Sequence, residues 1–192
     1  MPSKKSNFNR SRLRNIYEES FSWIESMLIA ALCVIILFTL FFHTSGVSGS
    51  SMNDTLANND RLLLVNAFYT PKRGDIVVLS RSDLRNEDGS TPTPIIKRVI
   101  GIGGDVVEIK DGGVYVNGEM LVEEYVKGKT YPIHNPTDNP CTVPDGFVYV
   151  LGDNREGSSD SRTKDIGLID ERYIVGKAVL RFFPFDTFGS LY

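Results

Sequence analysis

A 22-residue segment, residues 21–42, constrains this chain more than any other feature, because its only charged side chain is Glu25. Residues 27–42 within it are apolar except for one threonine. A helix needs about 20 residues of this kind to cross the core of a bilayer. Trp23 would then lie at the level of the lipid headgroups. The segment therefore predicts one amino-terminal transmembrane helix, which we assign to residues 21–43.

Charge is distributed unevenly around this segment. Residues 1–20 hold five Lys or Arg and two Glu, a net charge of +3, whereas residues 43–192 hold 16 basic and 21 acidic side chains, a net charge of −5. Basic flanks of membrane helices tend to stay in the cytoplasm. We therefore expect a cytoplasmic tail at residues 1–20, a location in the cell membrane, and an extracytoplasmic domain. The weakly acidic domain argues against nucleic acid as a partner.

Two alternatives compete with a retained anchor. A buried core helix of this apolarity is one. The other is a cleavable secretory leader, since Gly46, Val47 and Ser48 supply the small residues that a cleavage site needs. The apolar stretch is longer than the ~7–15 residues of such leaders, however, and a polar segment of about 20 residues precedes it. A retained anchor is the prediction.

The cysteines and histidines are too few and too scattered for a metal centre. Cys33 lies in the apolar segment and Cys141 far from it, so no disulfide framework is expected. His43 and His134 are the only histidines, and no Cys/His cluster has metal-ligand spacing. We therefore expect neither a metal nor a cofactor.

Residues 44–192 are predicted to form a single, mainly β domain. Seven short runs are rich in β-branched and aromatic residues and are separated by Gly, Pro, Asn or Asp. These runs are residues 61–65, 75–79, 95–100, 105–109, 114–116, 147–151 and 177–183. Asp111-Gly112 and Asn117-Gly118 tolerate the positive φ angles of tight hairpin turns, so two hairpins are expected there.

Three polar segments carry candidate chemistry, and each has a simpler interpretation. Residues 48–56 are a small-residue run that could be a plain linker. In a strand at residues 94–101, Lys97 and Arg98 would point to opposite faces. A buried lysine can lose its charge and become a base, although an exposed edge lysine is the simpler alternative. Residues 152–162 hold three acids, two arginines and three serines, which suits either a hydrogen-bonded scaffold or a solvated loop.

Together and in this order, these segments resemble the conserved boxes of type I signal peptidases, the membrane-bound serine proteases that remove signal peptides from exported proteins. The matching motifs are Ser51-Met52-x-x-Thr55-Leu56, Arg73-Gly74-Asp75-Ile76-Val77-Val78, Lys97-Arg98-Val99-Ile100-Gly101 with Gly104-Asp105, and Gly152-Asp153-Asn154-Arg155 with Ser158, Asp160, Ser161 and Arg162. The resemblance implies a mainly β fold of the kind that signal peptidases share with SOS-repressor proteases.

The resemblance also implies roles for individual residues. Ser51 would be the nucleophile and Lys97 its general base, a Ser-Lys variant of the triad. Ser158 resembles the serine that hydrogen-bonds and orients this lysine. A carboxylate beside the base would favour its charged form, so we expect Asp160 to pair with Arg162 or with structural donors rather than with Lys97.

Two positions depart from the family pattern. Some members carry, two residues before the nucleophile, a serine that donates to the oxyanion, and this chain has Gly49 there. The oxyanion hole would then rely on backbone N–H groups, including that of Ser51. Members commonly have proline where this chain has Asp54, which places a carboxylate near the site.

By family position, the substrates would be preproteins with small residues at the −3 and −1 positions. Val47, Met52, Leu56 and Ile96 would line the pockets that receive them, and membrane lipid would be the second partner. A self-cleaving SOS-type repressor is an alternative that would need a DNA-binding amino terminus. A membrane-tethered β binding module is another, and it would leave the Ser51 and Lys97 motifs unexplained.

Overall fold

The computed structural model describes residues 4–66, 69–80, 93–126, 128–133 and 138–192. The chain divides into two compact units, residues 1–41 and residues 42–192.

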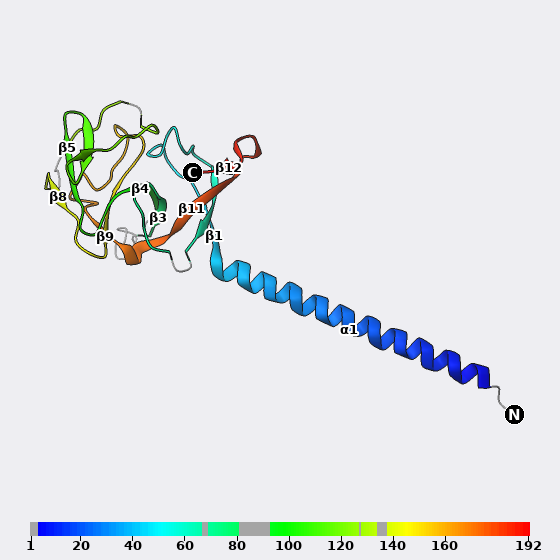
Figure 1. The fold of residues 1–192 in the computed structure, drawn as a ribbon. Coiled ribbons are helices and arrows are strands. Elements are labelled where there is room, and N and C mark those ends of the chain that lie inside the picture. The colour runs from blue at the N-terminus through cyan, green and yellow to red at the C-terminus, as the bar shows by residue number, and fades with distance from the viewer. Residues whose placement is uncertain (1–3, 67–68, 81–92, 127, 134–137) are drawn as a thin grey trace, which may run out of the picture. The chain divides into compact units, whose positions relative to one another are not determined.

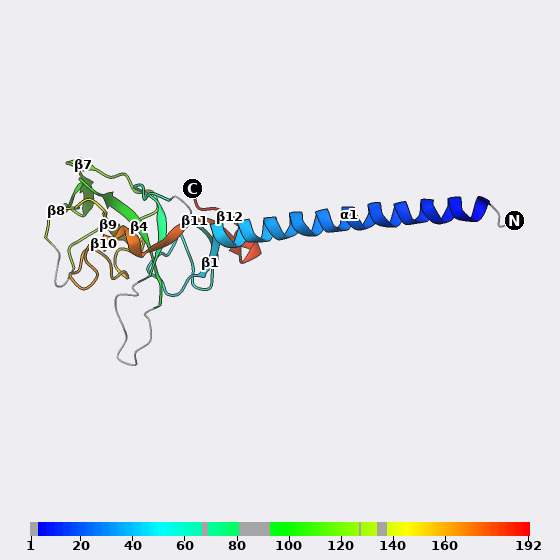
Figure 2. The same ribbon diagram turned by 90° about the horizontal axis from the view of Figure 1, so that it is seen from below.

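The first unit is a single continuous helix, α1 (Lys4–Phe41), seen in Figures 1 and 2. It includes most of the predicted tail as well as the apolar segment. Large apolar side chains along it are exposed, among them Phe21, Trp23, Met27 and Leu32. Among the described residues, no helix combines the length and apolarity needed to cross a membrane. The predicted helix is thus present, and its role as an anchor stays a prediction.

The second unit is built on an eight-stranded antiparallel sheet. Its order is β1-β2-β11-β3-β4-β9-β10, with β12 paired to β11. The strands are β1 (Phe42–Gly46), β2 (Arg61–Val65), β3 (Ile76–Leu79), β4 (Ile95–Ile102), β9 (Phe147–Leu151), β10 (Ile169–Asp170), β11 (Ile174–Phe183) and β12 (Gly189–Ser190). Because β1 begins at Phe42, the last two residues of the segment assigned to the anchor belong to this sheet.

A smaller antiparallel sheet follows the order β7-β6-β5-β8. Its strands are β5 (Val106–Lys110), β6 (Gly113–Val116), β7 (Glu119–Met120) and β8 (Cys141–Thr142), and two 3₁₀ helices, η1 (Glu171–Tyr173) and η2 (Phe185–Thr187), complete the described elements. In both views it lies on the side of the unit away from β11 (Figures 1 and 2). Asp111 and Asn117 adopt φ angles of 54° and 55° in the two hairpin turns, as predicted.

The mainly β fold is confirmed, and all seven predicted runs form strands with ends shifted by up to three residues. The strands that the sequence analysis did not predict are β1, β7, β8, β10 and β12. Four of them have only two residues, too few for an alternating pattern to stand out, and β1 has a single apolar side chain, that of Phe42.

One buried cluster packs the segment after β1 onto the larger sheet. Val47, Met52 and Leu56 are at most 6% exposed. They pack with side chains of β2, β3, β4 and β11, namely Leu62, Leu64, Ile76, Val78, Ile96 and Ala178. Within the sheet, Val77 of β3 pairs with Lys97 of β4, and Ile76 pairs with Arg98. The segment that contains Ser51 is thereby held over the strand that contains Lys97.

Candidate active site

Ser51 and Lys97 are in direct contact. The Nζ of Lys97 donates a hydrogen bond to the Oγ of Ser51 at 2.8 Å and another to the carbonyl oxygen of Ile96 at 3.1 Å. Lys97 is only 4% exposed. The two residues that the sequence analysis named as nucleophile and base are 46 positions apart, and the fold brings them within hydrogen-bonding distance.

Burial lowers the pKa of Lys97 from its ordinary value, because taking an ammonium group out of water penalises the charged form. The carboxylates of Asp160 and Asp153 act in the opposite direction, and burial prevails. A lysine with a lowered pKa is neutral in a larger fraction of molecules at a given pH. It can then accept a proton from the hydroxyl that it touches.

Arg98 points away from the nucleophile, as the alternation of a strand requires. Its Nε and Nη2 donate to the two carboxylate oxygens of Asp153 at 2.9 and 2.6 Å, and its Nη1 donates to the carbonyl of Gly74 at 2.9 Å. Thr55 also donates to Asp153, at 2.6 Å. The carboxylate of Asp153 is therefore compensated by a guanidinium and tied to the nucleophile segment.

The loop at residues 152–162 holds the backbone around the nucleophile. Asn154 donates from its backbone N–H to the carbonyl of Ser51 at 3.0 Å, and from its side chain to the carbonyl of Ser50 at 3.1 Å. A Cβ added to Gly152 would lie 2.5 Å from the carbonyl oxygen of Ser51. Only glycine permits this approach, so the loop is the hydrogen-bonded scaffold that its composition suggested.

Asp160 pairs with Arg162, which confirms the expected pairing. The Nε and Nη2 of Arg162 donate to the two carboxylate oxygens of Asp160 at 2.8 and 3.0 Å, and both side chains are buried. Asp160 also accepts from the backbone N–H of Gly152 at 3.1 Å. Its carboxylate is thus committed to the loop itself rather than to the lysine.

One expectation about a supporting residue is not met. The Oγ of Ser158 makes no bond to Lys97; among the described residues it is the one buried side-chain nitrogen or oxygen without a hydrogen-bond partner. Gly49 adopts a φ of +94°, and its N–H donates to the side chain of Asn58 at 3.0 Å. That N–H is therefore engaged within the protein, and Gly49 contributes a turn.

The four residues named for the substrate pockets, Val47, Met52, Leu56 and Ile96, all belong to the buried cluster described above. Met52 and Ile96 are next to Ser51 and Lys97 in the sequence, and Val47 and Leu56 lie within five positions of Ser51. The structure brings them together beside the dyad, and their contact with a substrate stays a prediction.

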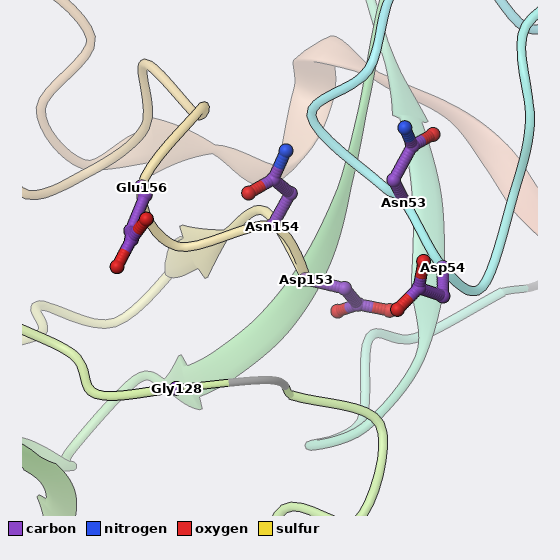
Figure 3. A pocket seen from close by; sticks show the side chains of 6 residues that line it. All are labelled: Asn53, Asp54, Gly128, Asp153, Asn154 and Glu156. Atoms are coloured by element: carbon purple, nitrogen blue, oxygen red, sulfur yellow. The ribbon is translucent and has the colours of Figure 1, made fainter.

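A polar cavity of about 440 Å³ opens beside the nucleophile segment (Figure 3). Its lining residues are Asn53, Asp54, Gly128, Asp153, Asn154 and Glu156. Asp54 and Asp153 both line this cavity, as Figure 3 shows. In the part of the chain that the structure describes, no group of three or more His, Cys, Asp or Glu side chains is arranged to hold a metal ion.

Sequence reasoning assigned no role to Glu123, Tyr125 or Thr130, which are connected to this site by side-chain contacts. Their partners are Arg98 and Arg155, about 25 to 32 positions away. The local sequence around them is that of an ordinary polar loop, so no pattern within it signals these contacts.

Comparison with known proteins agrees with this geometry. Residues 20–183 match the family model described as signal peptidase, peptidase S26. The chain is 40% identical over 174 residues to signal peptidase I P of Bacillus subtilis subsp. natto, which covers 85% of this chain and 89% of that protein. It is 35% identical over 190 residues to signal peptidase IB of Staphylococcus aureus strain COL, which covers 89% and 93%. A probable signal peptidase I-2 from a Synechocystis strain is 36% identical over 176 residues, covering 88% and 78%.

Proposed function

Because the chain belongs to the signal peptidase family, peptidase S26, we propose that it cleaves preproteins with Ser51 as nucleophile and Lys97 as general base. Membership makes it a type I signal peptidase, a serine hydrolase that acts on signal-peptide-bearing proteins. The observation that carries the assignment of the two residues is the 2.8 Å contact between a buried lysine amine and a serine hydroxyl.

The proposed reaction begins when the neutral amine of Lys97 takes the proton of Ser51 as its Oγ attacks the scissile carbonyl. The backbone N–H of Ser51 donates to the oxyanion that forms. The ammonium of Lys97 then protonates the departing amine, which leaves an ester between the signal peptide and Ser51. Lys97 next activates a water molecule, which hydrolyses the ester and regenerates the free serine.

We further propose that small side chains at the −3 and −1 positions of the preprotein contact Val47, Met52, Leu56 and Ile96. These side chains are closely packed and at most 7% exposed. A surface with so little free space accommodates alanine better than a large side chain. An extended substrate would pair with a neighbouring strand through backbone hydrogen bonds.

The location is also a proposal. Residues 21–43 would anchor the enzyme in the cell membrane, with residues 1–20 in the cytoplasm and residues 44–192 outside. It is supported by the nearly uncharged segment, by the basic flank before it, and by the exposed apolar side chains of α1. Enzyme and preprotein would then share one surface, which raises their effective concentration.

The test is cleavage of a signal-peptide-bearing preprotein by the full chain in lipid vesicles. Ser51→Ala and Lys97→Ala should each lower the rate by roughly four orders of magnitude or more. Ser159→Ala and Lys164→Ala change exposed side chains of the same types and should leave it unchanged. Cleavage by either dyad variant at the rate of these controls would contradict the assignment.

A further inference from the structure

Tyr125 covers the guanidinium of Arg98, the residue that follows the base. The guanidinium carbon of Arg98 lies 3.8 Å from the centre of the Tyr125 ring. The edge of the same guanidinium holds the carboxylate of Asp153. The ring therefore restrains the guanidinium of Arg98 in the direction perpendicular to the guanidinium plane. Asp153 restrains the same group within that plane.

Glu123 connects this ring to a second buried arginine. The hydroxyl of Tyr125 donates to Glu123 at 2.8 Å. The Nη1 and Nη2 of Arg155 donate to the two oxygens of Glu123 at 2.8 and 2.5 Å. The side chain of Glu123 is 8% exposed and that of Arg155 is fully buried. Arg155 also donates to Thr130 at 2.6 Å, so it binds the segment after β7 at both Glu123 and Thr130.

Both arginines act on adjacent residues of the loop that supports the nucleophile. Arg98 holds Asp153, and the Nε of Arg155 donates to the carbonyl of Gly152 at 3.0 Å. Gly152 packs against the carbonyl of Ser51, and Asn154 donates to that same carbonyl. The contacts thus form one closed circuit that runs from the base-bearing strand through Tyr125 and Glu123 to the backbone of the nucleophile.

We propose that Tyr125 and Glu123 are positioning residues for catalysis: they hold the backbone of residues 152–154, and through it the Oγ of Ser51, within reach of the amine of Lys97. The proposal rests on the proposed function, since it assigns a role within the same dyad. Neither residue touches Ser51 or Lys97 directly, so each acts through Arg98 or Arg155.

The consequence for kinetics is specific. A misplacement of about 1 Å between reacting groups can cost about a hundredfold in rate. The four side chains proposed to receive the substrate belong to a separate buried cluster. Loosening the circuit should therefore lower kcat and leave KM nearly unchanged.

The experiment measures kcat and KM separately for the full chain in detergent micelles, with a synthetic signal-peptide substrate and at a temperature well below unfolding. Tyr125→Leu removes both the ring and the hydroxyl, Tyr125→Phe removes only the hydroxyl, and Glu123→Gln removes the charge. Tyr131→Leu and Glu124→Gln are the matched controls, because both side chains are exposed and lie in or next to the same segment.

We expect Tyr125→Leu to lower kcat by about a hundredfold with KM within about twofold of the wild type. Glu123→Gln should also lower kcat. Tyr125→Phe keeps the ring over Arg98 and should therefore retain a large part of the wild-type kcat. The controls should match the wild type. Rates are normalised to the folded fraction, and if Tyr125→Leu does not fold, Glu123→Gln is judged by the same criterion.

Normal kcat in Tyr125→Leu and Glu123→Gln, or a rise in KM alone, would overturn the inference, while Ser51-dependent cleavage would leave the proposed function standing. If the Ser51→Ala variant cleaves the substrate at the wild-type rate, both the proposed function and this inference are overturned.

Discussion

At the scale of single residues, two adjacent cations of β4 have opposite environments. Lys97 is placed where burial lowers its pKa, beside a hydroxyl that needs a base. Arg98 is placed where a carboxylate and an aromatic ring keep its charge compensated. The first arrangement favours a neutral amine and the second a permanent guanidinium. The chemistry of the site depends on this difference within one dipeptide.

The lowered pKa of Lys97 predicts how activity depends on pH. The proposed base works only when it is neutral, so kcat/KM should rise with pH as Lys97 loses its proton, and should level off above its pKa. Since burial lowers that pKa, the midpoint of the rise should lie below about 10.4, the ordinary value for lysine. A pH–rate profile on a signal-peptide substrate measures it. A midpoint at or above the ordinary value would contradict a buried base.

The motifs were sufficient to pick out residues that the fold brings into contact. Ser51 and Lys97 are hydrogen-bonded, and Asp160 pairs with Arg162. Ser158 was assigned a bond to Lys97 by family position, whereas its buried Oγ has no hydrogen-bond partner among the residues that the structure describes. Tyr125 could not be assigned at all, since its role comes from packing on an arginine 27 positions away.

At the scale of elements, the decisive contact is between the loop at residues 152–162 and the nucleophile segment. Neither is a regular strand, yet each follows one: the loop follows β9, and the nucleophile segment follows β1. The two strands are fixed in one sheet, so the segments that leave them are brought to defined positions. The alternation of aromatic and β-branched residues made β9 predictable, whereas β1 was assigned in part to the anchor because its first residue is an apolar phenylalanine.

Gly152→Ala tests this contact. The new Cβ would meet the Oγ of Ser158 and would lie 2.5 Å from the carbonyl oxygen of Ser51, so the loop or the segment that contains Ser51 must move. We expect kcat to fall by about a hundredfold or more, measured by initial rates on a signal-peptide substrate. Gly189→Ala is the control, because nothing lies within 4 Å of the Cβ it would add. Equal activity in the two variants would show that the site tolerates the displacement.

At the scale of the whole molecule, the chain combines a long helix with a β unit that has its own buried clusters. The β unit contains every residue of the proposed dyad and of the circuit around it. Chemistry and membrane attachment are thus assigned to separate units. Composition averaged over the chain conceals this division, which only the position of the apolar segment reveals.

Removal of residues 1–41 should separate the two functions. The fragment 42–192 is a compact unit, so we expect it to cleave a soluble signal-peptide substrate within a few-fold of the full chain. On a preprotein inserted in vesicles it should be slower by roughly a hundredfold, because the shared surface no longer concentrates the partners. Initial rates on both substrates provide the comparison, and equal rates on vesicles would contradict a role for the helix in substrate encounter.

The register of β3 against β4 has a consequence for the activity of a folded sample. Val77 opposite Lys97 places the amine toward Ser51. A slip of the pairing by one residue would exchange the two faces of β4 and present Arg98 to the nucleophile instead. Arginine does not give up its proton in proteins, so a slipped molecule would keep its strands and be catalytically silent. Turnover per folded molecule thus reports the fraction of chains in correct register, which spectroscopy of secondary structure would not distinguish.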